Sequence, residues 1–388
     1  MGISNAIVIG AGIGGLAAAA ALARRGMAVT VLEQSPRIAE VGAGLQISPN
    51  GLAVLRALGL ESTLVQRGAV RGRAVILRDE TCAEVAHIDL ERLGADQRYF
   101  FVHRADLIDL LAGAARRANV SLELGAEVAR IEPGPLPELT MADGSRRRAE
   151  LIVDASGIHA RGRALLNGAD TPVFSGQVAW RALVPNQFNH LDAAQITMGP
   201  GRHLVSYPLR GGRLINLVAV EEREGWAAEG WNHNDDPAHL QAAFAGFGGQ
   251  AGEMIAAVDR VTLWGLHLHP VAQVWQQGGV TLLGDAAHPT LPFLAQGANM
   301  ALEDAWVLAD CVLRLPSDEA LPAYQAAREA RARRVIRAAE GNARKYHLRP
   351  GLARWAAHAG LRLASKLAPG RVVGAFDWLY RHDVTKRA

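Results

Sequence analysis

Cysteine is scarce in this chain of 388 residues, which contains only Cys82 and Cys311. The two lie far apart and match neither a metal-ligand spacing nor a C-x-x-C motif, so we interpret them as small buried hydrophobic residues. Aromatic residues make up 5% of the chain, charged residues 20% and hydrophobic residues 49%. These proportions are typical of an ordinary soluble globular protein with a sizeable core.

A secretion signal and a membrane span are also lacking. A signal peptide opens with basic residues, and none of the first five residues is basic. Residues 6–23 carry no charge and are about as long as a membrane-spanning helix. Glycines and small alanines punctuate this run, however, which favours a soluble nucleotide-binding unit. We therefore expect a cytoplasmic protein without a membrane partner.

Positive charge gathers near the end of the chain, although the formal net charge is only +3. The residues concerned are Arg328, Arg331, Arg333, Arg334, Arg337, Arg344, Lys345, Arg349 and Arg354. We interpret them as solvated faces of helices; the alternative is a surface that steers anionic small molecules or a nicotinamide nucleotide toward a site. No aromatic interleaving or known fold motif accompanies the charge, so a nucleic-acid partner is not expected.

Residues 3–33 follow the pattern strand, glycine turn, helix, strand and terminal acid, with a helix that extends to Arg25. In a G-x-G-x-x-G turn the first glycine permits a tight bend, the second lets backbone approach a pyrophosphate, and the third allows close helix–strand packing. The helix N-terminus offers free N–H groups to phosphates, and Glu33 is placed to accept hydrogen bonds from a ribose. The unit predicts a dinucleotide site, whose glycines are Gly10, Gly12, Gly14 and Gly15.

The pattern changes near residue 176, where alternating strands with glycine-rich turns begin and continue to about 274. Residues 280–283 return to a buried parallel strand, and a long helix is expected from about 297 to 314. We predict an α/β fold in which a discontinuous Rossmann-type domain, 1–175 and 276–388 with C-terminal helices, is interrupted by a β-rich substrate domain, 176–275. Earlier elements include a helix opening at Ser48-Pro49, a helix over 104–118, and a hairpin turning at 142–145 with 150–153 as its return strand.

The stretch GDAAHPTLPFLAQGANMALEDA, residues 284–305, is much more specific than the opening motif. It resembles the second flavin fingerprint of the single-component FAD-dependent aromatic hydroxylases, the para-hydroxybenzoate hydroxylase family. The nearest resemblance is to the branch with salicylate hydroxylase, 3-hydroxybenzoate 6-hydroxylase and 6-hydroxynicotinate 3-monooxygenase. Three motifs occur in the family's order across nearly the whole chain, so the resemblance implies FAD as the dinucleotide of a Rossmann-type FAD-binding domain.

The resemblance also assigns further residues to the cofactor. It implies that Asp285, after Gly284, contacts the ribityl or pyrophosphate region, and that Arg104 leans on the FAD. A strand-end carboxylate can accept ribityl hydroxyls, and N–H groups of a helix start stabilise an anionic reduced flavin. Small residues around Gly44, in the segment 41–47, suggest backbone that passes close to a ligand. The residues implied at the isoalloxazine edge are Gln296, Gly297, Ala298 and Asn299.

The middle motif departs from the family pattern. Members usually carry Asp-Gly, then Ser three residues later and Arg three further on, serving both FAD and NAD(P)H. Here Ser156-Gly157 stands for Asp-Gly and Ala160 for the Ser, whereas Arg163 fits and Asp154 comes two residues early. Ser156 can hydrogen-bond but carries no charge, so the choice between NADH and NADPH stays open.

His203 and Tyr207 form a His-x-x-x-Tyr pattern on a predicted strand. Residues four apart on a strand share one face, so both side chains can face one pocket. A neutral imidazole, with a pKa near ~6.5, is suited to taking a phenolic proton near neutral pH. The pair resembles the base and its neighbour in this branch; the alternative is a pair of hydrogen-bonded wall residues.

Other candidates concern the substrate and metals. Arg181 could meet a substrate carboxylate, although a buried salt bridge explains it as well. The apolar segment 290–294 is expected to cover an aromatic ring, with Pro292, Phe293 and Leu294 as substrate contacts. His267 and His269 are interpreted as strand-surface residues, and no metal site is predicted because no acidic partner sits at ligand spacing.

The leading hypothesis is an FAD-dependent aromatic-ring monooxygenase that uses NADH or NADPH and O2 to hydroxylate a small hydroxylated aromatic or heteroaromatic acid. The family's reaction proceeds through a flavin C4a-hydroperoxide, an electrophile that needs an electron-rich ring and hence a base. Two alternatives stay open: a flavin oxidase or dehydrogenase without external NAD(P)H, suggested by Ser156, and a non-catalytic flavin-binding regulator with a basic surface. A homodimer is expected from family habit.

Overall fold

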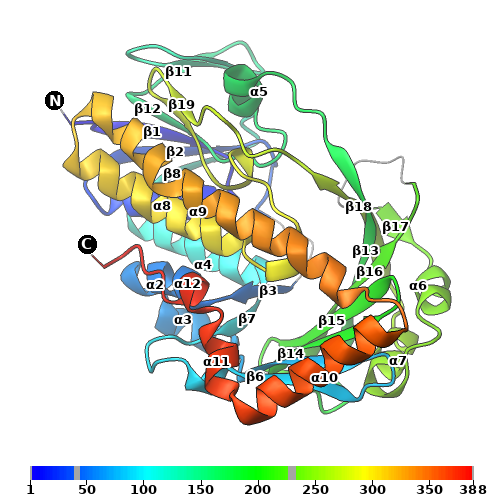
Figure 1. The fold of residues 1–388 in the computed structure, drawn as a ribbon. Coiled ribbons are helices and arrows are strands. Elements are labelled where there is room, and N and C mark those ends of the chain that lie inside the picture. Colours follow the sequence, from blue (N-terminus) through cyan, green and yellow to red (C-terminus); the bar gives the residue numbers. More distant parts are fainter. Residues whose placement is uncertain (1, 39–43, 226–232, 387–388) are drawn as a thin grey trace.

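The computed structural model describes residues 2–38, 44–225 and 233–386, so residues 41–43 of the segment expected near the ligand lie outside the described residues (Figure 1). A six-stranded sheet has the order β19-β20-β12-β1-β2-β8. All neighbouring pairs are parallel except β19 with β20. Its strands are β1 (Asn5–Ile9), β2 (Ala28–Glu33), β8 (Ser121–Leu124), β12 (Leu151–Asp154), β19 (Gln276–Gln277) and β20 (Val280–Leu282). The predicted return of the chain to this sheet at 280–283 is confirmed.

Helix α1 (Ile13–Ala23) crosses from β1 to β2 and ends two residues before the predicted Arg25. It packs between α4 (Arg104–Arg117) and α8 (Gly297–Arg314). The alanines from Ala17 to Ala21 are fully buried. A helix that is apolar all round is buried on all sides, which explains why this uncharged run lies inside the fold. None of the helices in the described part of the chain is both long and apolar enough to cross a membrane.

The second large sheet has eight strands in the order β17-β18-β13-β16-β15-β14-β5-β6. Its pairs are antiparallel except β14 with β5. The bounds are β5 (Ala74–Asp79), β6 (Glu84–Asp89), β13 (Val173–Pro185), β14 (Ala193–Gly199), β15 (Arg202–Leu209), β16 (Leu214–Glu222), β17 (His233–Asp235) and β18 (Val261–Leu268). The expected β-rich layer is present, but β5 and β6 join it from a segment assigned to the dinucleotide domain.

A small hairpin corrects one prediction. Strand β10 (Glu138–Met141) pairs with β11 (Arg146–Arg148), and β9 (Val128–Glu132) flanks β10. The return strand is therefore β11, and the expectation that 150–153 fills this place is wrong. Residues 151–153 are buried and uninterruptedly apolar, as a central parallel strand requires, whereas the three arginines of β11 are exposed.

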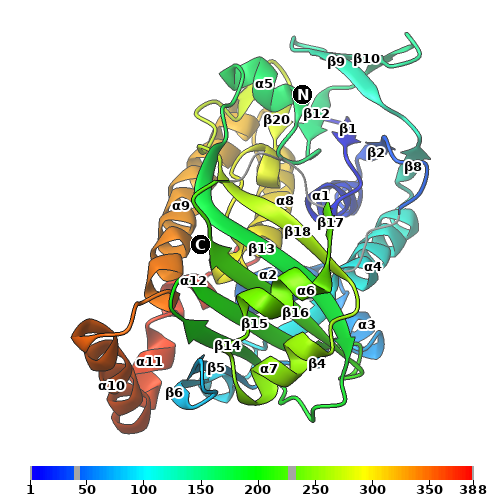
Figure 2. The same ribbon diagram turned by 90° about the vertical axis from the view of Figure 1, so that its right-hand side faces the viewer.

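Four helices end the chain: α9 (Ser317–Tyr346), α10 (Leu352–Leu367), α11 (Pro369–Gly374) and α12 (Asp377–Tyr380). Helix α9 packs along α8 and extends toward the large sheet, where α10 lies against β6 (Figures 1 and 2). The residue that follows α9 is thereby brought to the edge of the substrate layer.

The remaining elements connect these layers. Helix α2 begins at Pro49 as predicted, and Gly59 follows its end with a φ of +71°. Both cysteines are half-buried rather than fully buried, and the Cys82 thiol donates to the carbonyl of Gly248. The other bounds are α2 (Pro49–Ala57), α3 (Glu61–Gln66), α5 (Arg161–Asn167), α6 (Pro237–Ala243), α7 (Gly249–Ala256), β3 (Gly44–Ile47), β4 (Val70–Arg71) and β7 (Phe100–His103), with short 3-10 turns at Leu90–Arg92, Gly284–Ala286 and Pro292–Leu294.

Candidate active site

A cavity of about 1210 Å³ lies where the two sheets meet the C-terminal helices. Most residues singled out from the sequence line it, although they come from distant parts of the chain. These are Gly10, Gly12, Gly14, Glu33, Gly44, Arg104, Ser156, Gly157, Arg181, His203, Tyr207, Gly284, Asp285, Pro292, Phe293, Leu294, Gln296, Gly297 and Ala298. Gly15 and Asn299 are not part of the lining.

The glycine turn after β1 has the shape that a pyrophosphate cradle needs. A Cβ on Gly15 would lie 2.0 Å from the carbonyl oxygen of Gly10, so this glycine serves close packing of α1 on the turn. Gly10 has a φ of +98°, which only glycine adopts readily. A Cβ on Gly12 would meet nothing within 4 Å, because this position faces the open cavity at the start of α1.

Gly12 gives a direct test of this cradle. Replacing Gly12 with Ala is expected to leave the melting temperature of the FAD-free protein unchanged, since the added methyl group meets no protein atom. FAD affinity should fall by about tenfold or more, because the methyl group occupies the space of the pyrophosphate. Flavin fluorescence titration measures the affinity. Gly15→Ala is the counterpart, expected to lower the melting temperature itself; unchanged FAD affinity in the Gly12 variant would contradict the cradle.

Glu33 ends β2 beside this turn. Its Oε2 accepts the N–H of Ala11 at 2.8 Å, and its Oε1 accepts the N–H of Ser35 at 2.9 Å. The carboxylate is therefore fixed at the cavity wall by two backbone donors. Its expected hydrogen bonds to a ribose stay a prediction.

The middle motif forms the turn between β12 and α5. Both the N–H and the hydroxyl of Ser156 donate to Oδ1 of Asp154, and the N–H of Gly162 donates to Oδ2 at 2.7 Å. Asp154 thus organises the turn from behind Ser156. Burial raises the pKa of Asp154, although these hydrogen bonds oppose the rise.

Arg163 is buried and holds the second fingerprint in place. Its guanidinium donates to the carbonyls of Ala286 and Ala287 at 3.1 and 3.3 Å, and to Asp170 at 3.0 Å. The middle motif and the 284–305 stretch are therefore one unit in space. In this chain the arginine of the middle motif supports the flavin fingerprint through the backbone.

Asp285 projects into the cavity from the turn that follows β20. Shielding from bulk solvent within the cavity raises the pKa of its carboxyl group, while the nearby His288 and Arg104 oppose this rise. Gly297 and Ala298 line the same cavity at the N-terminus of α8, where N–H groups of the first turn have no partner within the helix. A carboxylate at a strand end and a helix N-terminus give the donor and acceptor set expected for a flavin.

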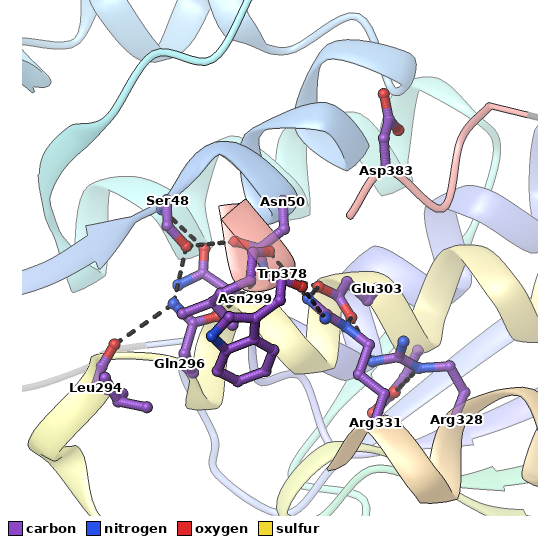
Figure 3. Close-up of polar contacts among 12 residues, drawn as sticks. Ser48, Asn50, Leu294, Gln296, Asn299, Glu303, Arg328, Arg331, Trp378 and Asp383 are labelled. Carbon is purple, nitrogen blue, oxygen red and sulfur yellow. Dashed lines mark hydrogen bonds and ion pairs between the residues drawn. The ribbon is translucent and has the colours of Figure 1, made fainter. Parts of the chain in front are cut away.

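A buried polar network fixes the start of α8 (Figure 3). The side chain of Asn299 accepts the N–H of Ser48 at 3.1 Å and donates to the carbonyls of Gln46 and Ala295 at 2.9 and 2.8 Å. Gln296 donates to the hydroxyl of Ser48 at 3.0 Å. Asn299 is fully buried, so its side chain positions the cavity wall and does not form it.

The network continues into an ion cluster between α8 and α9 (Figure 3). Arg328 contacts Glu303 at 2.6 Å and Asp304 at 2.7 Å, and Arg331 contacts Glu303 at 2.7 Å. The side chain of Arg328 is only 1% exposed. The interpretation of the C-terminal arginines as a solvated face is therefore wrong for these two, because their i, i+3 spacing aims both at buried carboxylates of α8.

His203 and Tyr207 both lie on β15 and line the cavity, so the shared face predicted from their spacing is confirmed. His203 is 1% exposed. Burial lowers the pKa of its imidazole well below the usual 6.5, and the neighbouring His347 lowers it further. His203 is therefore a neutral imidazole near pH 7. The ring of Phe293 lies 5.8 Å away, centroid to centroid, on the segment expected to cover the substrate.

Tyr207 stacks on Phe101 with ring centroids 5.2 Å apart. Burial raises the pKa of its hydroxyl, although the positive charge of Arg181 opposes the rise. A Cβ on Gly44 would lie 2.5 Å from the Tyr207 ring, so only glycine at this position leaves room for the Tyr207 side chain of β15. Arg181 lies over the Trp264 ring at 4.1 Å, which places a cation in the aromatic wall of the cavity.

Sequence reasoning missed one residue behind the wall and two in it. His347 follows α9 and hydrogen-bonds to His203 from outside the cavity lining, but nothing in its sequence spacing indicates this contact. His267 and His269 line the cavity rather than the outer surface, and His269 lies 3.0 Å from Asp170. Within the described residues, no three His, Cys, Asp or Glu side chains are grouped to hold a metal ion.

The fold and the cavity together define a flavin-type dinucleotide enzyme with a substrate cavity between its two large sheets. Residues 4–339 match the family described as "FAD binding domain". The chain is 38% identical to 3-amino-4-hydroxybenzoate 2-monooxygenase of Streptomyces cremeus over 89% of this chain and 88% of the relative. It is 34% identical to 3-hydroxybenzoate 6-hydroxylase of Polaromonas naphthalenivorans, over 97% of this chain and 96% of the relative.

Among solved structures, Klebsiella pneumoniae HpxO complexed with FAD and uric acid superposes with a TM-score of 0.84 at 27% identity, over 96% of this chain and 95% of that chain. The chain belongs to this family of FAD-dependent monooxygenases that act on aromatic substrates. The predicted resemblance, the FAD cofactor and the α/β class are thereby confirmed.

Proposed function

We propose that this monooxygenase hydroxylates a small hydroxylated aromatic or heteroaromatic acid, with NADH or NADPH as co-substrate. The observation that carries the proposal is the neutral, buried His203, which lines the cavity with Tyr207 and lies next to the ring of Phe293. A base that faces this cavity suits a substrate with an acidic ring hydroxyl. Because NAD(P)H is an intracellular co-substrate, the proposal includes a cytoplasmic location.

The residues present fit FAD. The glycine turn would hold its pyrophosphate, Asp285 its ribityl chain, and the start of α8 its ring edge. Bound FAD, once reduced by NAD(P)H, supplies the activation of O2. The chain's own side chains then bind and prepare the substrate: Phe293 covers the ring, and His203 takes the proton from the ring hydroxyl. Removing this proton raises the electron density of the ring.

Arg181 is the proposed partner of the substrate carboxylate. Replacing it with Met, which keeps the length but removes the charge, is expected to raise KM about 10- to 100-fold, since a hydrogen bond to a charged group contributes roughly 1.5–3 kcal/mol. The matched control is the same ring without its carboxylate, whose KM should be nearly unaffected. Equal losses for both compounds in steady-state assays would remove Arg181 from carboxylate binding.

A second candidate reaction is oxidation of the substrate by the flavin without external NAD(P)H. The observation behind it is Ser156, which is tied to Asp154 and brings no negative charge to the position of the family's Asp. Anaerobic mixing of FAD-loaded protein separates the two reactions. Flavin bleaching by NADH or NADPH supports the hydroxylase, whereas bleaching by a hydroxylated benzoate alone supports the oxidase.

The third hypothesis, a non-catalytic regulator, depended on a basic surface. Two of the arginines that made up that surface are buried in the ion cluster, and the relatives are enzymes. Catalysis therefore accounts better for the site. The expected homodimer stays a prediction from the family.

A further inference from the structure

His203 is the first member of a hydrogen-bonded chain that leads out of the cavity. Its Nδ1 lies 2.7 Å from Nε2 of His347, and Nδ1 of His347 lies 2.9 Å from Oε1 of Glu222. His203 and the His347 side chain are each 1% exposed, whereas the side chain of Glu222 is 45% exposed. The three residues thus connect the cavity lining at His203 to solvent. They come from β15, the end of α9 and the end of β16, so only the folded chain brings them together.

We propose that His347 and Glu222 form a proton relay that carries the substrate's hydroxyl proton from His203 to solvent. The proposal rests on the role of His203 as the base in the proposed function. It assigns His347 and Glu222 as positioning residues, because both act through His203 and not on the substrate.

The carboxylate of Glu222 determines which atom donates in each hydrogen bond between Glu222, His347 and His203. An ionised carboxylate only accepts hydrogen bonds, so His347 carries its proton on Nδ1 and presents the lone pair of Nε2. His203 must then donate from Nδ1, which leaves its own Nε2 as the acceptor toward the chamber. Gln177 also approaches Nδ1 of His347, but at 3.4 Å it is farther away than Glu222.

The relay moves one proton to solvent without leaving a positive charge on either imidazole. The substrate hydroxyl gives its proton to Nε2 of His203, whose Nδ1 proton passes to Nε2 of His347, whose Nδ1 proton passes to Glu222 and then to water. The substrate is left as the phenolate, both imidazoles are again neutral, and water gains the proton. Reversal of the same steps returns a proton to the product's hydroxyl and resets both rings.

The surroundings explain why such a relay is needed. Burial and the neighbouring His347 lower the pKa of His203, so a proton is poorly held there once taken. Burial also lowers the pKa of His347; Glu222 opposes this shift and Arg202 adds to it. Besides His347, the titratable ring packed on His203 is that of Tyr346, with the ring centroids of His203 and Tyr346 5.2 Å apart. Burial raises the pKa of Tyr346 to about 12, so this hydroxyl stays neutral.

The tautomers can be tested without turnover. Nitrogen-15 histidine NMR of the FAD-loaded protein at pH 7 is expected to show His203 and His347 as neutral Nδ1–H imidazoles, identified by their loss in His203→Gln and His347→Gln. In Glu222→Gln the His347 signals should shift toward a mixture of tautomers. A charged or Nε2–H His347 in the unmodified protein would overturn the relay.

Proton release tests the transfer itself. Oxidised FAD-loaded protein is mixed with 3-amino-4-hydroxybenzoate in weak buffer containing a pH indicator. The unmodified protein is expected to release a proton in a fast phase. His347→Gln should slow this phase about tenfold or more. In His347→Ala, added imidazole should restore the fast release. Glu222→Gln should slow release less, since water can replace a half-exposed carboxylate. The rate of flavin reduction by NAD(P)H should be the same in the His347 and Glu222 variants as in the unmodified protein.

The control is Glu221→Gln, because Glu221 lies on the same strand but pairs with Arg202 and Arg223. It should release the proton at the unmodified rate. Proton release that is lost in His203→Gln but normal in His347→Gln would overturn the relay and leave His203 as the base. Normal release in His203→Gln, or none in the unmodified protein, would instead contradict His203 as the base and with it the proposed mechanism.

Discussion

Replacing His203 with Gln is expected to lower the hydroxylation rate at pH 7 by about 100-fold or more, which is the range of a lost general base. The side chain lines the cavity without contributing to the glycine turn, so flavin content should stay near that of the unmodified enzyme. Activity should recover partly at higher pH, where the phenol ionises by itself. The measurement is the rate of product formation across pH, with bound FAD determined from its absorbance.

The pH profile of the unmodified enzyme has a defined sign. The base acts when neutral, and burial lowers the pKa of His203 well below 6.5. The rate should therefore stay level as pH falls through 6.5 and decline only below the lowered pKa. His239→Gln, at an exposed histidine on α6 outside the cavity, is the matched control and should leave the rate unchanged. Equal rates at pH 7 for His203→Gln and the unmodified enzyme would remove His203 from the mechanism.

Replacing Arg328 with Met should lower the free energy of unfolding by about 3–5 kcal/mol, because removing one partner of a buried ion pair leaves uncompensated charge. Arg328 contacts Glu303 and Asp304, and both carboxylates are fully buried. Since this cluster supports the start of α8, FAD retention should weaken as well. Urea unfolding of the FAD-loaded protein measures the change.

The control is Arg333→Met, which removes a half-exposed arginine that pairs with Glu329 on the same helix. Exposed pairs at this spacing contribute only about 0.3–0.5 kcal/mol, so this variant should be nearly as stable as the unmodified protein. Similar stability losses in the two variants would show that the buried cluster does not hold α8 and α9 together.

Low pH should weaken the ion cluster formed by Arg328, Glu303 and Asp304. Burial alone would raise the pKa of Glu303 and of Asp304, but nearby positive groups outweigh it and lower both to about 2. These groups are Arg328 and Arg331 at Glu303, and His288 and Arg328 at Asp304. Both pKa values are lower in the folded than in the unfolded protein, where they are near ~4. Their contribution to stability is therefore present above about pH 4 and lost as pH falls toward 2.

Much of the fold and of the cofactor site could be predicted because local patterns determine them. The glycine turn, the acid at Glu33 and the helix from 297 to 314 follow from spacing and periodicity, and the structure places them as expected. The face shared by His203 and Tyr207 follows from the two-residue repeat of a strand.

The features that were missed depend on contacts between distant segments. His347 reaches His203 across 144 positions, and no local pattern marks it as different from a surface histidine at a helix end. The segment around Arg328 has the composition of a solvated helix, and Arg328 is buried only because α8 presents Glu303 and Asp304 to it. Strands β5 and β6 join the large sheet through the parallel pairing of β5 with β14, which depends on the tertiary fold.

The most direct test of the central claim uses FAD-loaded enzyme, NADH or NADPH, and isotopically heavy oxygen gas (¹⁸O₂). Hydroxylated benzoates and pyridine carboxylates are offered in turn, and products are analysed by mass spectrometry. The expected result is substrate-stimulated NAD(P)H oxidation and a product that has gained one heavy oxygen atom from O2. Oxidised product without the label, or hydrogen peroxide as the only oxygen-derived product with every compound, would contradict ring hydroxylation by this enzyme.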